Sequence, residues 1–288
     1  MEGNLERSDP LDERQFQLVI KRLADSLSYG TDVSPFLGSG IEYAQSRPYV
    51  PGDPVKSIDW RVTARTGKYF IKEYEAPKRM PVYLVIDTSA SMTVQSTTGG
   101  PSKYATAIQI AGGVALAALD RVSPVGVVGA GERDLRIRPS LGRQQIMEWL
   151  FLLRRFRYDE TTSVARQIKE VSSSLSNRAL FIVLSDLHDP EAISAMKLAG
   201  QRHDCLLLRM QDPAELGIKG AGIVRAREAE TGREFTTNVA RIGPDFDADE
   251  QLLRGGGIDQ MTVRIDQPYL ARLRQFLNSR GALGRTAR

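Results

Sequence analysis

Short apolar runs that alternate with helix-patterned segments are the feature that most constrains the fold. The runs Val82–Ile86, Val125–Ala130, Ala179–Leu184 and Cys205–Leu208 are rich in valine, isoleucine and leucine, as in parallel strands that are buried on both faces. Segments with apolar residues at helical spacing lie between them. These helical segments are Lys103–Leu119, Gln144–Phe156, Ser163–Leu175 and Glu191–Leu198. The alternation predicts an α/β fold, with a mostly parallel sheet flanked by helices.

The chain is predicted to have three parts. Residues 1–80 comprise a helix over Asp12–Leu27 and an irregular segment rich in Gly and Pro. We expect this segment to pack on the sheet, because it is too polar to form a core of its own. Residues 81–280 form the α/β domain, and residues 281–288 a loose basic tail. The domain is also predicted to contain an exposed strand at Leu135–Arg138, a hairpin around Thr231-Gly232, helices at Asp247–Leu253 and Tyr269–Ser279, and a strand at Met261–Arg264.

Composition excludes several classes of function. The chain has 39 Lys and Arg against 35 Asp and Glu, so its net charge of +4 is small for 288 residues and does not indicate a nucleic-acid partner. One cysteine, Cys205, which we expect to be buried, excludes a disulfide framework and a cysteine zinc cluster. Two histidines exclude a multi-histidine metal site. No apolar run approaches the ~18 residues of a membrane helix, so we expect a cytoplasmic protein without membrane insertion.

A polar motif, Asp87-Thr88-Ser89-Ala90-Ser91, directly follows the predicted strand Val82–Ile86. In open α/β sheets, ligands bind beyond the carboxyl ends of the strands. A carboxylate and two hydroxyls are hard oxygen ligands, which suit Mg²⁺ or Mn²⁺. Taken alone, the motif is also typical of a polar turn whose short side chains bond their own backbone.

Two further segments make a metal site the better interpretation. Ser185-Asp186 follows the predicted strand Ala179–Leu184, and Thr161-Thr162 precedes the helix Ser163–Leu175, where a threonine is also a candidate N-cap. The set resembles the metal-ion-dependent adhesion site of von Willebrand factor A domains. The resemblance implies that Mg²⁺ (or Mn²⁺) is bound and that a partner's carboxylate completes its coordination. The metal ligands that it implies are Asp87, Ser89, Ser91, Thr162 and Asp186.

Some neighbouring residues have two interpretations. Thr161 is an alternative to Thr162 as a ligand. His188, two residues after Asp186, either joins the site or is an exposed loop histidine, which we favour. The basic and aromatic segment Arg154–Tyr158 is interpreted as a solvated helix end, where cations interact favourably with the helix dipole.

A second signature precedes the sheet. It reads Arg47-Pro48-Tyr49-Val50-Pro51-Gly52-Asp53-Pro54, then Ile58-Asp59-Trp60-Arg61, then Thr63-Ala64-Arg65. This looks like the signature of bacterial domain-of-unknown-function family fifty-eight, and the resemblance covers roughly Ser39 to Arg280. Proteins of that family carry a von Willebrand A-like domain and commonly accompany MoxR-type AAA+ ATPases. The resemblance therefore implies such an ATPase as a partner.

The role of this signature, Arg47–Arg65, has two interpretations. It is either a surface that binds a partner or a structural segment that is fixed to the sheet by arginine–carboxylate pairs and a buried Trp60. We favour the structural interpretation, because an irregular segment needs such contacts to stay docked. Asp53 is then expected to cap the short turn Pro54–Ser57.

The expected function is that of a non-enzymatic adaptor or co-chaperone of a MoxR-type ATPase, which contacts a partner carboxylate through the metal ion. The alternative is a metal-dependent phosphoester hydrolase with Asp87 as nucleophile. Against the hydrolase, a phosphatase pattern has a second aspartate where this chain has Ser89. The chain also lacks the Gly-x-x-x-x-Gly-Lys-[Ser/Thr] motif of phosphate-binding loops.

Overall fold

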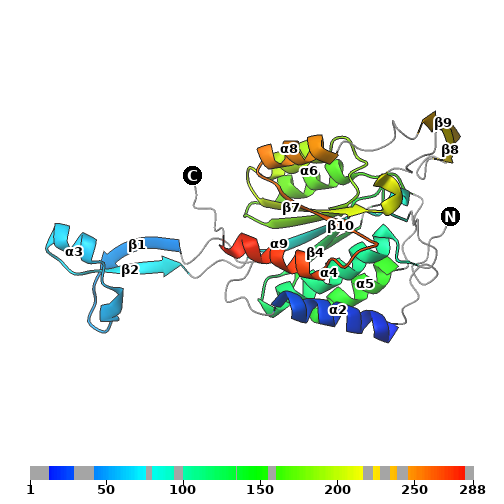
Figure 1. Cartoon of the computed structure of the whole chain (residues 1–288). Helices are drawn as coiled ribbons and strands as arrows, with labels where there is room; N and C mark the ends of the chain where they lie inside the picture. Colours follow the sequence, from blue (N-terminus) through cyan, green and yellow to red (C-terminus); the bar gives the residue numbers. More distant parts are fainter. Residues whose placement is uncertain are drawn as a thin grey trace.

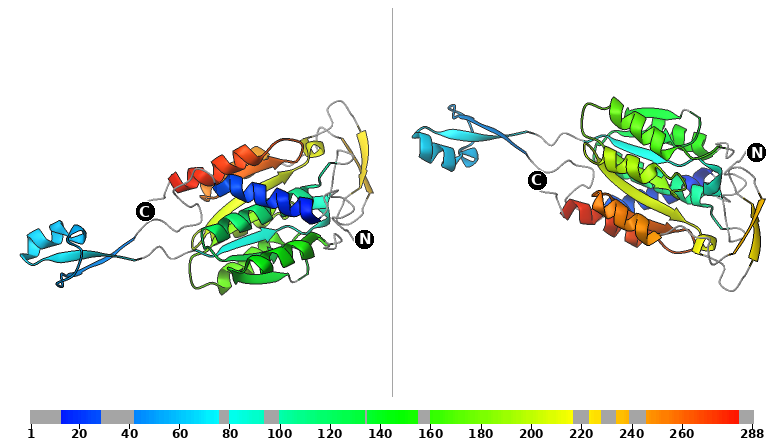
Figure 2. Two further views of the ribbon diagram at one scale, coloured as in Figure 1. Left: turned by 90° about the horizontal axis from the view of Figure 1, so that it is seen from below. Right: turned by 90° about the horizontal axis from the view of Figure 1, so that it is seen from above.

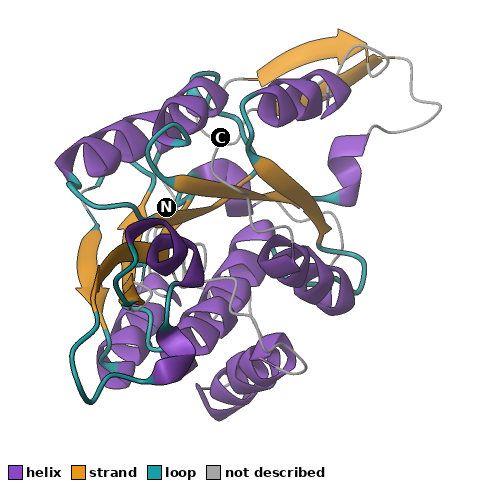
Figure 3. Ribbon diagram, turned by 90° about the vertical axis from the view of Figure 1, so that its left-hand side faces the viewer, coloured by secondary structure: helices purple, strands orange, loops and turns teal. Residues whose placement is uncertain are grey.

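A six-stranded sheet with helices on both faces forms the body of the molecule (Figures 1 and 3). The computed structural model describes residues 13–28, 42–75, 80–93, 100–133, 135–154, 160–216, 223–227, 234–238 and 246–282. Across the sheet the strands are β10 (Asp259–Arg264), β7 (Asp204–Gln211), β6 (Leu180–Ser185), β3 (Val82–Ile86), β4 (Val125–Gly129) and β5 (Arg136–Ser140). Neighbouring strands are parallel, except that β5 is antiparallel to β4. The predicted α/β fold with a mostly parallel sheet is confirmed.

The central strands are buried on both faces because each face is covered by helices. In β3, Leu84 and Ile86 belong to one core cluster and Val85 to the other, as the alternation of side chains along a strand requires. The first cluster lies under α2 (Glu13–Ser28), α4 (Lys103–Asp120), α5 (Arg143–Arg154) and α9 (Leu270–Ala282). The second lies under α6 (Val164–Ser174), α7 (Ala192–Ala199) and α8 (Phe246–Gly255).

Helix α2 packs closely on α4 and so belongs to the same core as the sheet, although it precedes the sheet by many residues. Two buried glycines of α4 allow this approach. A Cβ on Gly112 would lie 2.8 Å from Ile20 Cδ1, and a Cβ on Gly113 would lie 1.6 Å from Leu23 Cδ2. The space that a side chain would need at these positions is already filled by α2.

We expected the signature segment to pack on the sheet, and this prediction is wrong. Strands β1 (Glu42–Pro48) and β2 (Phe70–Glu75) form an antiparallel pair, and η1 (Val55–Ser57) and α3 (Trp60–Thr66) lie at its far end. All views place this unit, which we call the arm (residues 42–75), away from the α/β body (Figures 1 and 2). Trp60 is 63% exposed rather than buried. The arm holds itself together instead, through the buried bridge between Ile58 and Ile71.

The carboxylates of the arm also differ in part from expectation. The predicted arginine–carboxylate pairing is found between Arg47 and Asp53, in which both nitrogens donate to the carboxylate at 2.8 Å. However, Asp53 does not cap η1. Its Oδ2 accepts from Val50 N at 2.9 Å and closes the preceding turn, whereas the N-cap position of η1 is Pro54 and has no side-chain bond.

Several smaller predictions can also be compared with the structure. The hairpin is confirmed by β8 (Ile223–Arg227) and β9 (Glu234–Asn238), and Cys205 is buried as expected. Arg154 contradicts the solvated helix end, because it is 3% exposed and its guanidinium lies 4.3 Å from the ring centroid of Phe16. Residues 155–158, the first ten residues and the tail after 282 lie outside the described residues. No helix of the described ranges is both long and apolar enough to span a bilayer.

The glycine contact between α4 and α2 can be tested directly. We expect Gly113→Ala to lower the free energy of unfolding by ~1–3 kcal/mol, because overpacking costs more than the gain in helix propensity. Gly255 in α8 is the matched control, since a Cβ there meets nothing within 4 Å. Gly255→Ala should leave stability unchanged or raise it. Urea unfolding of both variants measures the difference, and equal behaviour would contradict close packing of α2.

Candidate metal centre

The predicted ligands meet at the point where the topology of the sheet changes direction. β3 and β6 are parallel neighbours, so Asp87 and Asp186 follow them at the same edge. The chain that leaves β3 enters α4 on one face, and the chain that leaves β6 enters α7 on the other. The region between the two strand ends is therefore the switch point of the sheet, where open α/β sheets bind ligands. We call this region the crevice.

Asp87 is at the centre of the hydrogen bonds in this crevice. Its side chain is completely buried. Oδ1 accepts from the backbone N of Ser89 at 3.1 Å, and Oδ2 accepts from the hydroxyls of Ser185 at 2.6 Å and Thr162 at 3.2 Å. The carboxylate thus fixes the Ser89 loop, the end of β6 and the Thr162 loop relative to one another.

The two serines of the motif lie next to each other. Ser91 is in the short 3₁₀ helix η2 (Ala90–Thr93), and its Oγ lies 2.9 Å from Ser89 Oγ. The loop that carries Thr162 is bound alongside, because Ala90 N donates to the Glu160 carbonyl at 3.0 Å. The structure therefore brings together Asp87, Ser89, Ser91 and Thr162.

The structure also distinguishes the two threonines. Thr162 donates its hydroxyl to Asp87, whereas the Thr161 hydroxyl points elsewhere and donates to Glu132 Oε1 at 2.7 Å. Glu160, which precedes them, is 2% exposed and accepts from Arg133 NH1 at 2.6 Å. Sequence reasoning missed Glu160, whose role is to hold the threonine loop beside Ser89.

Asp186 has partners that the sequence analysis did not identify. Lys103, the first residue of α4, is buried, and its Nζ donates to Asp186 Oδ2 at 2.6 Å. The same ammonium pairs with Glu215 in η3 (Pro213–Leu216). His188 Nδ1 lies 2.9 Å from Asp186 Oδ1, so this half-exposed histidine borders the site rather than standing free in the loop.

The two aspartates ionise differently. Burial, and then the negative charge of Asp186, raise the pKa of Asp87 to about 7. Burial opposes ionisation of Asp186 too, but the interaction with His188 and the charge of Lys103 outweigh it and lower its pKa. The contact with Asp186 in turn raises the pKa of His188. Asp87 is therefore the carboxylate that lacks a positive partner.

The donors present fit a hard divalent cation. When Asp87 is ionised and His188 is neutral, the carboxylates of Asp87, Asp186 and Glu215 outnumber the Lys103 ammonium by two charges. Among the described residues, no group of three or more His, Cys, Asp or Glu side chains is arranged to hold a metal. A cation held here would need serine and threonine hydroxyls as part of its coordination, a ligand chemistry that suits Mg²⁺ and not zinc.

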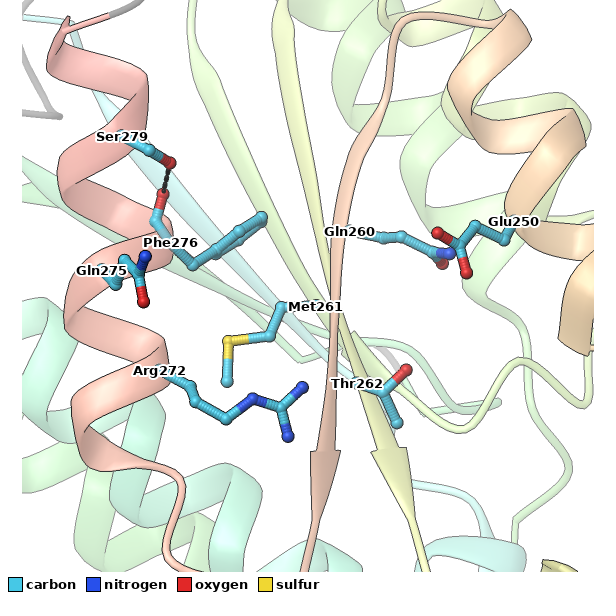
Figure 4. A pocket seen from close by; sticks show the side chains of 8 residues that line it. All are labelled: Glu250, Gln260, Met261, Thr262, Arg272, Gln275, Phe276 and Ser279. Atoms are coloured by element: carbon cyan, nitrogen blue, oxygen red, sulfur yellow. Dashed lines mark hydrogen bonds between the residues drawn. The ribbon is translucent and has the colours of Figure 1, made fainter.

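A separate cavity lies along the edge strand β10 (Figure 4). Its volume is about 410 Å³, and it is bordered by Glu250 of α8 and by Arg272, Gln275 and Phe276 of α9. None of the candidate ligands lines it, so it is distinct from the candidate metal centre.

The fold and the crevice define an α/β protein with oxygen ligands at the switch point of its sheet. The chain belongs to the family described as protein of unknown function DUF58, whose model matches residues 45–252. The resemblance to family fifty-eight is thereby confirmed. Uncharacterized proteins of Mycobacterium bovis and Mycobacterium tuberculosis are each 27% identical over 292 residues, which cover 94% of this chain and 90% of theirs.

Two solved structures show limited similarity. An uncharacterized membrane spanning protein from Vibrio fischeri is 16% identical, with a TM-score of 0.23, over 69% of this chain and 98% of that chain. The RO (RSR) protein of Deinococcus radiodurans is 17% identical, with a TM-score of 0.35, over 94% of this chain and 50% of that chain. These scores are too low to support a conclusion about fold or function.

The raised pKa of Asp87 predicts a stability cost at neutral pH. Below pH 3.8, the pKa of the Asp87 carboxyl in the unfolded chain, Asp87 does not lower the free energy of unfolding. The loss grows as pH rises toward about 7, because in that range Asp87 ionises freely only in the unfolded state. In a chelator, Asp87→Asn should therefore raise the free energy of unfolding above pH 7, by up to about 4 kcal/mol, and should have little effect near pH 4. Urea unfolding at both pH values measures this. Asp25→Asn on the exposed face of α2 is the control; a pH-independent effect of Asp87→Asn would contradict the buried charge.

Removing Lys103 should lower stability, whereas Asp87→Asn should raise it. Lys103→Met leaves the buried Asp186 and the partly exposed Glu215 without their cation, so we expect a loss of about 3–5 kcal/mol in unfolding free energy. Lys169→Met, which breaks an exposed pair with Glu191, should cost less than about 1 kcal/mol. The double variant Lys103→Met/Glu215→Gln should recover part of the loss. Equal costs for the two lysines would show that the buried cluster is not ionic.

Proposed function

We propose that the protein is a non-enzymatic binding module that recognises a partner carboxylate through Mg²⁺ (or Mn²⁺) at the crevice between β3 and β6. The observation that carries the proposal is that Asp87, among the described residues, accepts hydrogen bonds only from neutral donors, although a second carboxylate, Asp186, lies beside it. When Asp87 is ionised and His188 is neutral, the carboxylates of the site exceed the Lys103 ammonium by two charges. A bound dication neutralises this excess. Ser89 and Ser91 would touch the ion, and Thr162, Asp87 and Asp186 would bind it directly or through water.

The resemblance to von Willebrand A domains supports the same arrangement. In such a site few protein charges hold the cation, so the electrophilic ion retains affinity for an anionic oxygen of a partner. Thr162 is partly exposed and His188 is half exposed at the rim, which gives a partner access from solvent. The family resemblance favours a MoxR-type AAA+ ATPase as that partner, with this protein as its adaptor or co-chaperone.

The burial of Asp87 favours binding over hydrolysis. A nucleophilic carboxylate needs one oxygen directed at its substrate. Both oxygens of Asp87 accept hydrogen bonds from the protein, and the side chain is 0% exposed. These contacts suit a carboxylate that positions ligands. The phosphoester hydrolase is accordingly the weaker candidate.

Metal binding is tested by thermal unfolding in EDTA, in Mg²⁺ and in Mn²⁺. Metal at about a hundred times its dissociation constant adds ~2.7 kcal/mol of stability, so the melting temperature of the wild type should rise by several degrees. Asp87→Ala should not respond. Asp53→Ala is the matched control, because it removes a carboxylate from the arm, far from the crevice; this variant should respond like the wild type.

Partner capture is tested with the purified MoxR-type ATPase of the same organism. We expect Mg²⁺-dependent co-elution that is lost in EDTA and in Asp87→Ala, while the Asp53→Ala control co-elutes. Capture that persists in both EDTA and Asp87→Ala would overturn the metal bridge. Turnover of phosphoester substrates that is lost in Asp87→Asn would instead establish the hydrolase.

A further inference from the structure

The arm is a folded unit whose internal contacts leave one face unused. Asp59 is buried and accepts from Ser46 Oγ at 2.8 Å and from the backbone N atoms of Arg61 at 3.1 Å and Val62 at 3.2 Å. It thereby caps α3 and ties it to β1. None of these bonds uses the side chain of Trp60 or of Arg61.

The unused face lies on one side of α3. Residues one, three and four positions apart on a helix share a side, and here these are Trp60, Arg61, Ala64 and Arg65, all of them exposed. Val62 and Thr63 face the opposite way, and the Thr63 hydroxyl accepts from Phe70 N at 3.1 Å. We call the four outward residues the α3 face.

The charges around the α3 face are almost all positive. Between residues 46 and 72 there are six cationic side chains and two carboxylates, and both carboxylates are engaged inside the arm, Asp53 with Arg47 and Asp59 as the helix cap. Arg61 and Arg65 are exposed and form no ion pair within the described part of the chain, and the same holds for Lys56 and Lys68. The surface is therefore an unpaired cationic patch around an aromatic ring.

The arm carries a second exposed aromatic ring besides Trp60. Trp60 is 63% exposed and Tyr69 is 61% exposed, with the Tyr69 ring 6.4 Å from that of Tyr49. Trp, Tyr and Arg are the residues that dominate the energy of protein interfaces. Large apolar groups left in water without a structural role mark an interaction surface.

We propose that the α3 face, with Tyr69, is a docking surface for an acidic protein patch, and that it is separate from the candidate metal centre. The arm joins the body at the amino end of β3, whereas Asp87 follows the carboxyl end of the same strand. Figure 1 shows the arm well separated from the α/β body. This inference does not depend on the metal.

The distribution of charge favours a compact protein patch over nucleic acid. Six cations lie between residues 46 and 72, but Glu42, Glu73 and Glu75 occur where the two strands join the body. A polyanion that runs along the arm needs cations over its whole length and the six cations lie between residues 46 and 72, whereas an acidic patch with an apolar centre needs only the far end. Charge complementarity of this kind sets specificity and association rate.

Trp60 supplies the signal for the test. The chain has two tryptophans, and the other, Trp149, is 2% exposed. The full-length protein, in EDTA and at low salt, is titrated with a short synthetic peptide that alternates glutamate with leucine. We expect the Trp60 emission to shift to shorter wavelength as the ring leaves water, with an affinity that falls as salt is added. Trp60→Phe should abolish the shift, and a glutamine–leucine peptide should not produce it.

Charge reversal makes the test specific. Arg61→Glu/Arg65→Glu should weaken binding of the acidic peptide at least tenfold and should bind a lysine–leucine peptide instead. Lys21→Glu/Arg22→Glu, which makes the same change in net charge on the exposed face of α2, should bind like the wild type. Circular dichroism and melting temperature confirm that each variant is folded.

Three results would overturn the proposal. One is no spectral response of the wild type at millimolar peptide. Another is equal weakening by the reversal on α3 and the reversal on α2. The third is tighter binding of oligothymidine or of phosphatidylserine vesicles in the same titration, which would assign the face to nucleic acid or to membrane. Because EDTA is present throughout, each of these results leaves the metal proposal unaffected.

Discussion

Two carboxylates, Asp87 and Asp186, are held at neighbouring strand ends with almost no access to water, and much of the structure is arranged around them. Burying ionised groups costs several kcal/mol each unless they are paired and hydrogen-bonded. The negative charge of Asp186 is offset by the ammonium of Lys103. Asp87 receives only neutral donors, so its charge is the least compensated in the crevice. The folded state is therefore stabilised when this charge is removed or balanced, whether by a nearby cation, by protonation of Asp87 or by a neutral side chain in its place.

The segments that surround Asp87 are fixed by close packing as well as by hydrogen bonds. Gly131 follows β4 at the same edge, and a Cβ there would lie 1.9 Å from Glu160 Oε2 and 2.4 Å from Thr88 Oγ1. Glycine at this position lets the carboxylate of Glu160 enter, and Glu160 in turn holds the threonine loop beside Ser89. Hydroxyl oxygens from three distant segments are thus brought to one place by the protein's own contacts.

Much of the fold could be predicted from the sequence, but not all of the site. Runs such as Val82–Ile86 are unambiguous because parallel strands buried on both faces are continuously apolar. Asp87 was singled out because it follows a predicted strand, and Thr162 was chosen over Thr161 by resemblance to a known site. Lys103 was missed although it is a charge in an otherwise apolar helix, because its partners lie 83 and 112 residues away in the sequence and no local spacing identifies them. Trp60 was misjudged because a tryptophan is expected to be buried, and the sequence does not show that the arm closes on Ile58 and Ile71 instead.

The connection between the arm and Asp87 through a single strand has a mechanical consequence. β3 is bonded along its whole length to β4 on one side and to β6 on the other, five residue pairs on each side. A pull between a partner on the arm and a partner at the crevice acts along the axis of β3. Such a force shears all of these backbone bonds together and cannot open them one at a time. β3 is therefore the part of the sheet that would bear tension applied between the arm and Asp87.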